Sequence, residues 1–217
     1  MRIRLLVGLV SATVAPSLLA QADPSSHQWY IGVQGGVLGF GTRVQDRSWV
    51  PTVGGSLLVT AKRTGLLVTV DEALGSGEAT GYTDVTTESG IRAVSFNHIR
   101  RYSAILTGYP IRSRSRPYVG LGFGLSQVIR PAVGGVFSSD AQAAAASSLA
   151  SNKSTTGHFL LLAGLEGSLG PVMGFVQYQL ASSPRFNQLL QGAIHGGQVG
   201  VRFSLGSARE GIHGGGY

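Results

Sequence analysis

Four charged residues inside otherwise apolar or small-residue segments are the first candidates for chemistry: Asp71, Arg101, Glu166 and Arg202. A charge removed from water is costly unless an opposite charge or hydrogen bonds compensate it. We therefore predict two internal ion pairs, Asp71–Arg101 and Glu166–Arg202. They would either order the interior of the protein or line a gated, selective pore.

No catalytic or metal-binding motif accompanies these charges. A serine nucleophile needs a histidine base, and a His-x-Ser pair would place both on one face of a strand. None of His98, His158 and His195 has a serine two residues further on, although pairings between strands remain open. The five histidines are dispersed and there are no cysteines, so no metal-ligand spacing or disulfide framework is present. We predict no enzyme, no cofactor and no metal.

The elements that must position the four charges are β-strands. In Tyr118–Leu125 every second residue is large and apolar, and the residues between them are mostly glycine. Because side chains alternate between the two faces of a strand, this segment has one continuous apolar face and one face almost without side chains. Such a strand suits a lipid-facing exterior and a narrow lumen.

Alternation and turn residues predict eight strands. They cover residues 28–40, 49–61, 65–75, 91–107, 117–129, 157–169, 172–183 and 192–205. Long polar connections at 41–48, 76–90, 130–156 and 184–191 alternate with shorter ones at 62–64, 108–116 and 170–171, of which 108–116 fits least well. This pattern predicts an all-β fold: an eight-stranded antiparallel up-and-down transmembrane β-barrel, with short turns and both chain ends on the periplasmic side.

The cost of placing a charge against lipid fixes the orientation of each strand. Glu166 would cost up to a few kcal/mol on a lipid-facing surface, so it points into the lumen and Phe159, Leu161 and Leu165 point outward. The same reasoning applied to the other strands gives a polar set of inward residues: Gln34, Ser56, Thr60, Thr69, Asp71, Arg101, Ser103, Thr107, Gln177, Gln179, Gln198, Arg202 and Ser204.

Composition and the chain ends indicate export. Arg2 and Arg4 precede an apolar segment that ends at Ala20-Gln21-Ala22, which predicts a signal peptide over 1–22 rather than a membrane anchor of ~20 apolar residues. The barrel would occupy 23–205 and a Gly-rich tail 206–217. Only 12% of residues are charged, and the scattered basic residues behind the net charge of +7 do not indicate nucleic acid. An Ala-rich stretch, 140–150, predicts a short helix in the longest loop.

The chain resembles the OmpA-like, or opacity-type, outer-membrane β-barrel family, also called the porin family β-barrel domain. The resemblance rests on the segments 29–36, 116–122 and 196–203 and covers essentially the whole mature chain. It implies a barrel in the outer membrane that contacts membrane lipid and is inserted by the barrel-insertion machinery through its C-terminal strand. The chain continues past Phe203 to Tyr217, whereas such proteins commonly end at the aromatic residue of the last strand.

Three functions fit these observations. The first is a monomeric barrel with a structural, envelope-integrity or surface-interaction role, whose lumen is plugged by side chains, as eight strands allow. The second is a narrow solute pore. The third is a soluble secreted β-barrel that binds a small apolar ligand, which would require apolar residues inside and polar residues outside.

Overall fold

A closed antiparallel β-barrel forms the body of the protein. The computed structural model describes residues 27–44, 47–111, 113, 115–182 and 189–207. The signal peptide predicted at 1–22 and the tail from 208 onward lie outside this part. The long strands are β1 (Gln28–Thr42), β2 (Ser48–Ala61), β3 (Thr64–Thr83), β4 (Ile91–Gly108), β5 (Ser115–Ile129), β7 (Thr155–Leu169), β8 (Val172–Ala181) and β9 (Leu190–Ser207).

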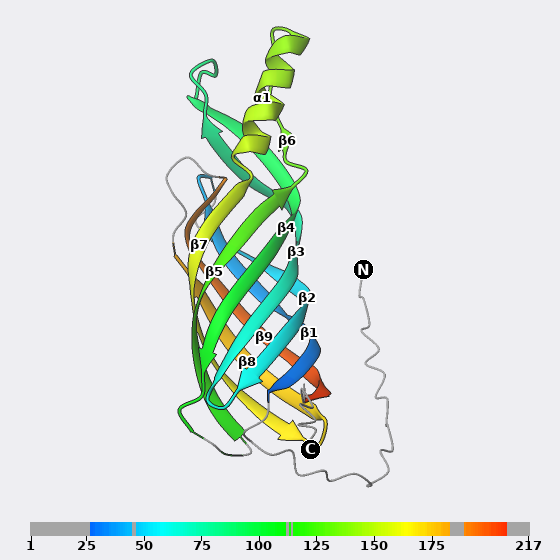
Figure 1. The fold of residues 1–217 in the computed structure, drawn as a ribbon. Coiled ribbons are helices and arrows are strands. Elements are labelled where there is room, and N and C mark those ends of the chain that lie inside the picture. Colours follow the sequence, from blue (N-terminus) through cyan, green and yellow to red (C-terminus); the bar gives the residue numbers. More distant parts are fainter. Residues whose placement is uncertain (1–26, 45–46, 112, 114, 183–188, 208–217) are drawn as a thin grey trace, which may run out of the picture.

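These eight strands follow one another around the barrel in chain order, and β1 pairs with β9 to close the ring. Two of the connections at the lower end are two-residue turns, Lys62-Arg63 and Gly170-Pro171 (Figure 1). The loops at the opposite end are longer, as the predicted up-and-down topology requires. The predicted fold class is therefore confirmed.

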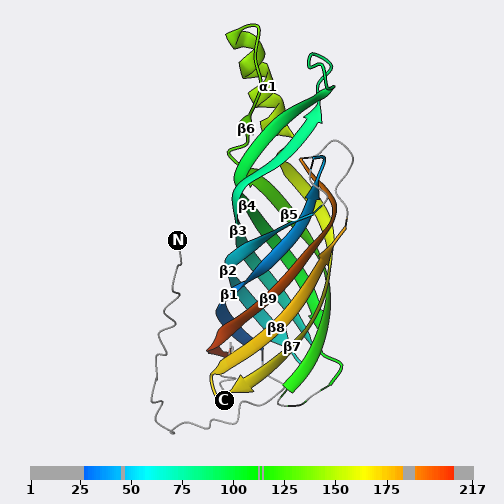
Figure 2. The same cartoon turned by 180° about the vertical axis from the view of Figure 1, so that it is seen from behind.

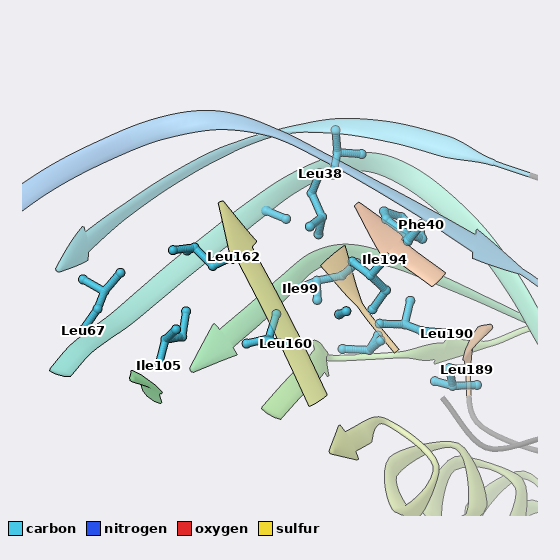
Figure 3. Packing of buried hydrophobic residues seen from close by; sticks show 14 of the residues in the cluster. Leu38, Phe40, Leu67, Ile99, Ile105, Leu160, Leu162, Leu189, Leu190 and Ile194 are labelled. Atoms are coloured by element: carbon cyan, nitrogen blue, oxygen red, sulfur yellow. The ribbon is translucent and has the colours of Figure 1, made fainter. Parts of the chain in front are cut away.

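Outward and inward residues alternate along the strands. The outward positions are exposed and apolar over most of the barrel, for example Leu121, Phe159 and Val199. The inward positions hold the polar set predicted from the sequence together with a cluster of buried apolar side chains (Figure 3). Each strand thus has the orientation that the cost of a lipid-facing charge predicts.

Inward-facing glycines make room for large side chains from the neighbouring strand. A Cβ atom added to Gly32 would lie 2.6 Å from Cγ of Arg202, and one added to Gly164 would lie 2.5 Å from Cζ of Tyr118. Four further inward glycines make room in the same way: Gly54 for Asp71, Gly122 for Ile105, Gly124 for His158 and Gly200 for Phe175. We call such an inward glycine, covered by a side chain of the neighbouring strand, a glycine seat. Alternating large and absent side chains therefore fill a lumen that is too narrow for a side chain at every position.

The structure departs from the sequence prediction above the barrel. Residues 76–83, expected within a loop, continue β3 and pair with β4 after a bulge between Leu74 and Glu78. A two-residue strand, β6 (Ala132–Val133), joins the upper part of β4, and the predicted helix forms as α1 (Asp140–Asn152). None of the described helices is long and apolar enough to cross a membrane. Figures 1 and 2 show α1 and the β3–β4 hairpin projecting beyond the barrel.

We call this projecting region, residues 75–97 and 130–154, the cap. A buried arginine, Arg92, holds it together. Arg92 is 2% exposed and forms an ion pair with Asp84, and its guanidinium lies 4.6 Å from the ring centroid of Phe137. Asp84 also accepts hydrogen bonds from the backbone and the hydroxyl of Thr86. Tyr82 donates its hydroxyl hydrogen bond to the Ala146 carbonyl, which ties the hairpin to α1.

A first prediction concerns the glycine seats. The substitution Gly54→Ala places a methyl group 2.5 Å from the Val70 carbonyl oxygen and against the Asp71 carboxylate. Overpacking of this kind costs about 1–3 kcal/mol, and here backbone atoms limit relaxation. Urea unfolding of the refolded protein in micelles should show this loss. The matched substitution Gly174→Ala, at an outward glycine with nothing within 4 Å, should change stability by less than about 0.5 kcal/mol. Equal losses of stability in the two variants would show that Gly54 is not required to make room for Asp71.

A second prediction concerns the pH dependence of the cap. Hydrogen bonds from Thr86 and Arg92 lower the pKa of Asp84 from 3.8 to about 2. A lowered pKa means that the carboxylate stabilises the folded cap above about pH 4 and loses this effect as the pH falls toward 2. Hydrogen exchange at residues 79–96 should therefore rise, relative to the barrel strands, between pH 4 and pH 2. Asp84→Asn should exchange faster at pH 5 and show no such step. A wild-type step that persists in this variant would assign the pH dependence to another group.

Candidate functional site in the barrel lumen

The lower lumen holds an ion cluster centred on Glu166 of β7. Its Oε1 lies 2.6 Å from Nε of Arg116, and its Oε2 lies 3.3 Å from Nη1 of Arg202. Glu166 and Arg202 are each 1% exposed, whereas the Arg116 side chain, nearer the lower end, is 28% exposed. One buried carboxylate therefore bridges two guanidinium groups from β5 and β9.

Arg202 also packs against uncharged groups of the lumen. Its guanidinium carbon lies 3.7 Å from the centroid of the Phe175 ring, a cation–π geometry, and its stem covers Gly32. Its remaining nitrogen atoms approach Ser56 Oγ and Gln177 Oε1, each at 3.5 Å. This set of contacts leaves the guanidinium little freedom to move within the lumen.

Sequence reasoning placed Arg116 in a turn, whereas the structure places it in β5. In the register of β5 and β7, Arg116 lies directly opposite Glu166. The inward orientation of Arg116 could have been found from the alternation of side chains along the strand, since the even-numbered residues Tyr118, Gly120 and Gly124 all face the lumen. The sequence prediction started the strand at Pro117, because proline usually marks a strand boundary, and so left Arg116 out of it.

Asp71 and Arg101 face each other in the register of β3 and β4, but their side chains bond to different groups. Asp71 accepts hydrogen bonds from Gln34 Nε2 at 2.5 Å and from Thr69 Oγ1 at 3.3 Å. Arg101 Nη2 instead crosses the lumen and donates to Gln179 Oε1 at 3.2 Å. No Asp71–Arg101 contact within 4.0 Å occurs among the ion pairs of the described residues.

Three glutamines connect the two buried arginines of the lumen, Arg101 and Arg202. Gln179 Nε2 donates to Gln198 Oε1 at 2.9 Å, and Gln177 Nε2 donates to the same oxygen at 2.7 Å. Because Arg101 donates to Gln179 and Arg202 approaches Gln177, the chain of contacts runs from one guanidinium to the other. We call these three residues of β8 and β9 the glutamine ladder.

The arginines determine how the amides of the ladder are oriented. A guanidinium can only donate hydrogen bonds, so Gln177 and Gln179 must present their oxygen atoms to Arg202 and Arg101. Their NH₂ groups then both point to Gln198, which accepts with its oxygen. Tyr118 adds a further hydrogen bond to Gln177 Oε1 at 2.8 Å. Every amide orientation therefore follows from the two fixed charges.

Apolar side chains fill the lumen above the ladder. Leu38 and Phe40 of β1, Ile99 of β4 and Ile194 of β9 are each at most 1% exposed (Figure 3). Leu189 and Leu190 extend this cluster toward the cap, where Thr80 Oγ1 donates to the Leu189 carbonyl at 2.5 Å. The apolar layer, the ladder and the Glu166 cluster follow one another along the barrel.

The described side chains of the lumen form ion pairs and hydrogen bonds. No hydrogen bond between a serine hydroxyl and a histidine ring joins any of the described residues, although His158 and Ser126 both face the lumen. No group of three or more His, Cys, Asp or Glu side chains within this part of the chain is arranged to hold a metal ion.

Comparisons with known proteins agree with this barrel. No protein-family model matches the chain, and no curated protein matches it by sequence. Among solved structures, the neisserial surface protein NspA has a TM-score of 0.51 at 13% identity, with 81% of this chain and 96% of NspA covered.

Two further barrels give lower TM-scores. Ail, the attachment invasion locus protein of Yersinia pestis, solved with the heparin analogue sucrose octasulfate, gives 0.49 at 9% identity, covering 82% of this chain and 99% of Ail. The N-terminal β-barrel domain of Pseudomonas aeruginosa OprF gives 0.43 at 12% identity, covering 82% and 98%. The likeness to NspA confirms, at the level of the fold, the predicted resemblance to OmpA-like eight-stranded outer-membrane β-barrels.

Proposed function

We propose that this protein is a non-enzymatic integral barrel of the bacterial outer membrane whose lumen is plugged by its own side chains. The observation that carries the proposal is the unbroken series of buried groups along the lumen. The Glu166 cluster, the glutamine ladder and the apolar layer follow one another along the lumen, and apart from Arg116, which is 28% exposed, their side chains are almost completely buried. A barrel filled in this way suits a structural, envelope-integrity or surface-interaction role better than transport.

The exterior supports a location in lipid. Exposed apolar side chains surround the barrel over several strands, and they include Ile31, Val33, Leu106, Leu121 and Phe203. A contiguous apolar surface of this extent is unfavourable in water. The soluble alternative, with apolar residues inside and polar residues outside, is the opposite of this arrangement on the outer face.

The height of the apolar surface matches a membrane. Trp29 lies near its lower edge, and Trp49 packs over Gly39 near its upper edge. The ten residue steps of β1 from Trp29 to Gly39 span about 33 Å along the strand, or about 25 Å of height at a tilt of about 40°. The outward charges of Glu72 on β3 and Arg100 on β4 compensate each other, with Arg100 Nε 2.7 Å from Glu72 Oε2.

The filled lumen favours a plugged barrel over the alternative of a narrow solute pore. A pore would require a continuous polar path, whereas Leu38, Phe40, Ile99 and Ile194 fill the upper lumen. The cap above them, held by Arg92, offers an ordered surface for contact with other cells or molecules. The last strand places Val199, Val201 and Phe203 on its outer face, and insertion machinery would engage this alternating segment. We propose that the inserted barrel is a monomer.

Fractionation tests the location. The full chain expressed with its N-terminal segment should sediment with outer membranes and resist extraction by alkaline carbonate. Unheated samples should migrate faster in gel electrophoresis than boiled ones, because a closed barrel stays compact. A soluble periplasmic or secreted protein without this gel shift would contradict the proposal and favour the apolar-ligand barrel.

Bilayer recording tests the plug. The wild-type barrel should give no resolved single-channel conductance, and Arg202→Ala should not open it, because Phe175, Tyr118 and the apolar layer still fill the lumen. The same variant should destabilise the barrel by about 3 kcal/mol or more, since Glu166 loses one of its two partners. Arg100→Ala, which removes an exposed outward ion pair, should have a much smaller effect on stability.

Two outcomes would argue for a pore. Discrete conductance of the wild type would contradict the plugged lumen directly. Conductance that appears only in Arg202→Ala would show that the Glu166 cluster acts as a gate.

A further inference from the structure

An apolar groove crosses the outer surface of the barrel. It has a volume of about 500 Å³ and lies over β1, β9, β8 and β7, four strands that follow one another in the ring (Figure 2). Three of the residues that line it, Val37, Val176 and Val199, are 47%, 50% and 58% exposed, so the groove opens to the outside and not to the lumen. Its volume falls in the range of roughly 300–1,000 Å³ that is typical of small-molecule sites.

Two small outward residues create the groove. The strand register places one residue from each of the four strands in a single row: Val37, Gly197, Tyr178 and Ala163. Tyr178 therefore lies between a glycine and an alanine. Leu161 and Leu165, the outward neighbours of Ala163 along β7, are large and exposed, so the surface is lower at Ala163 than on either side of it.

Gly197 leaves a space that the packing of the barrel wall does not require. A Cβ atom added to Gly197 would have Val37 Cγ2, at 3.8 Å, as its nearest contact, which is an ordinary van der Waals distance. At the glycine seats of the lumen, by contrast, an added Cβ atom would lie 2.2–2.6 Å from a neighbouring atom. The effect of the glycine at 197 is thus to leave the outer surface open.

A hydrogen-bonded pair of side chains borders the groove at its upper end. Tyr178 Oη lies 2.5 Å from Nδ1 of His195, which is two residues above Gly197 on β9. His195 lies directly opposite Gly39 in the register, and Trp49 packs over Gly39 near the upper edge of the apolar surface. The pair therefore lies at the level where lipid headgroups begin.

This pair supplies a hydrogen-bond donor whichever way its own bond runs. If Tyr178 donates to Nδ1, then His195 carries a hydrogen on Nε2, and if His195 donates, then the hydroxyl hydrogen of Tyr178 is left to donate elsewhere. Apolar surfaces within lipid have no hydrophobic reason to bind one another, so selective binding there requires close packing and hydrogen bonds. The groove provides the packing, and the Tyr178–His195 pair provides the hydrogen bond.

We propose that the groove binds an acyl chain of lipid A, the phosphorylated and multiply acylated lipid of the outer leaflet, and that the Tyr178–His195 pair donates a hydrogen bond to an oxygen atom of its headgroup. This inference rests on the proposed location in the outer membrane, where the end of the barrel with the long loops lies in the outer leaflet. The bound lipid fills the space between Val37 and Leu165 and gives this side of the barrel a fixed neighbour in the membrane.

A second copy of the chain fits the groove less well than a lipid. A twofold contact brings the same surface of both subunits together, so one groove would face another. Two facing grooves enclose empty space, and the side chains that line such a space lose their packing contacts. A flexible acyl chain can follow the groove and fill it.

Retention of lipid by the extracted barrel tests the site. Native mass spectrometry of the full chain, expressed in an outer membrane and extracted in mild detergent, should show a monomer with one bound lipid A. Gly197→Leu fills the groove and should retain at least about fivefold less. Gly174→Leu is the matched control: Gly174 is outward with nothing within 4 Å of its added Cβ atom, lies outside the groove, and should keep the lipid.

The outcomes separate this inference from the proposed function. A wild type that shows the heat-dependent gel shift but retains no lipid A would overturn the inference alone, and so would equal retention by Gly197→Leu. A wild-type dimer that Gly197→Leu converts to monomers would replace the lipid with a second copy. A wild type without the gel shift would contradict the membrane location itself.

A titration in nanodiscs tests the hydrogen bond. Lipid A added to the refolded barrel in phosphatidylcholine nanodiscs should shift amide resonances of the groove residues Val37, Ala163 and Gly197 in NMR spectra. Tyr178→Phe keeps the ring and should weaken binding about fivefold, the value of one hydrogen bond. Tyr102→Phe, at an outward tyrosine of β4, should bind as the wild type does. Shifts spread evenly around the barrel, or equal shifts with phosphatidylglycerol, would overturn the proposal.

Discussion

The limited width of the lumen is the constraint on which the rest of the structure depends. Eight strands enclose just enough space for side chains to fill, so large residues can face inward only where a neighbour gives up its own side chain. The glycines at positions 32, 54, 124, 164 and 200 meet this condition, and the side chains that lie over them include those of Asp71 and Arg202. The glycine content of the chain is therefore a packing requirement, and the polar network exists because glycine admits it.

The strand orientations could be predicted from the sequence because a single cost decides them. Placing Glu166 inward fixes the orientation of its strand, and the same test applied to Asp71 and Arg202 fixes two more. Where a strand faces water instead of lipid, an outward charge costs little, so this argument does not fix its orientation. In the sequence of residues 76–83, one alternating set is mostly polar and the other is small and Gly-rich, so their pattern did not distinguish a paired strand from a loop.

The contacts of the lumen were harder to predict than its composition. Side-chain length decides which groups meet, and Arg101 is long enough to pass the opposite carboxylate and reach Gln179 across the barrel. Arg116 was missed because Pro117 indicated a strand start, yet Pro117 lies where β5 pairs with β7 alone, an edge position that tolerates proline. The sequence shows which residues of a strand face the lumen. Which of those side chains meet across the closed lumen depends on the tilt and stagger of the strands.

The glutamine ladder has a consequence for how the barrel treats protons. Neither an amide nor a guanidinium gives up or takes a proton near neutral pH, so the groups that join Arg101 to Arg202 cannot relay one. Their orientations are also coupled, since turning one amide would set donor against donor along the whole chain. A hydrogen-bonded path that crosses the middle of the barrel is thereby an electrical insulator.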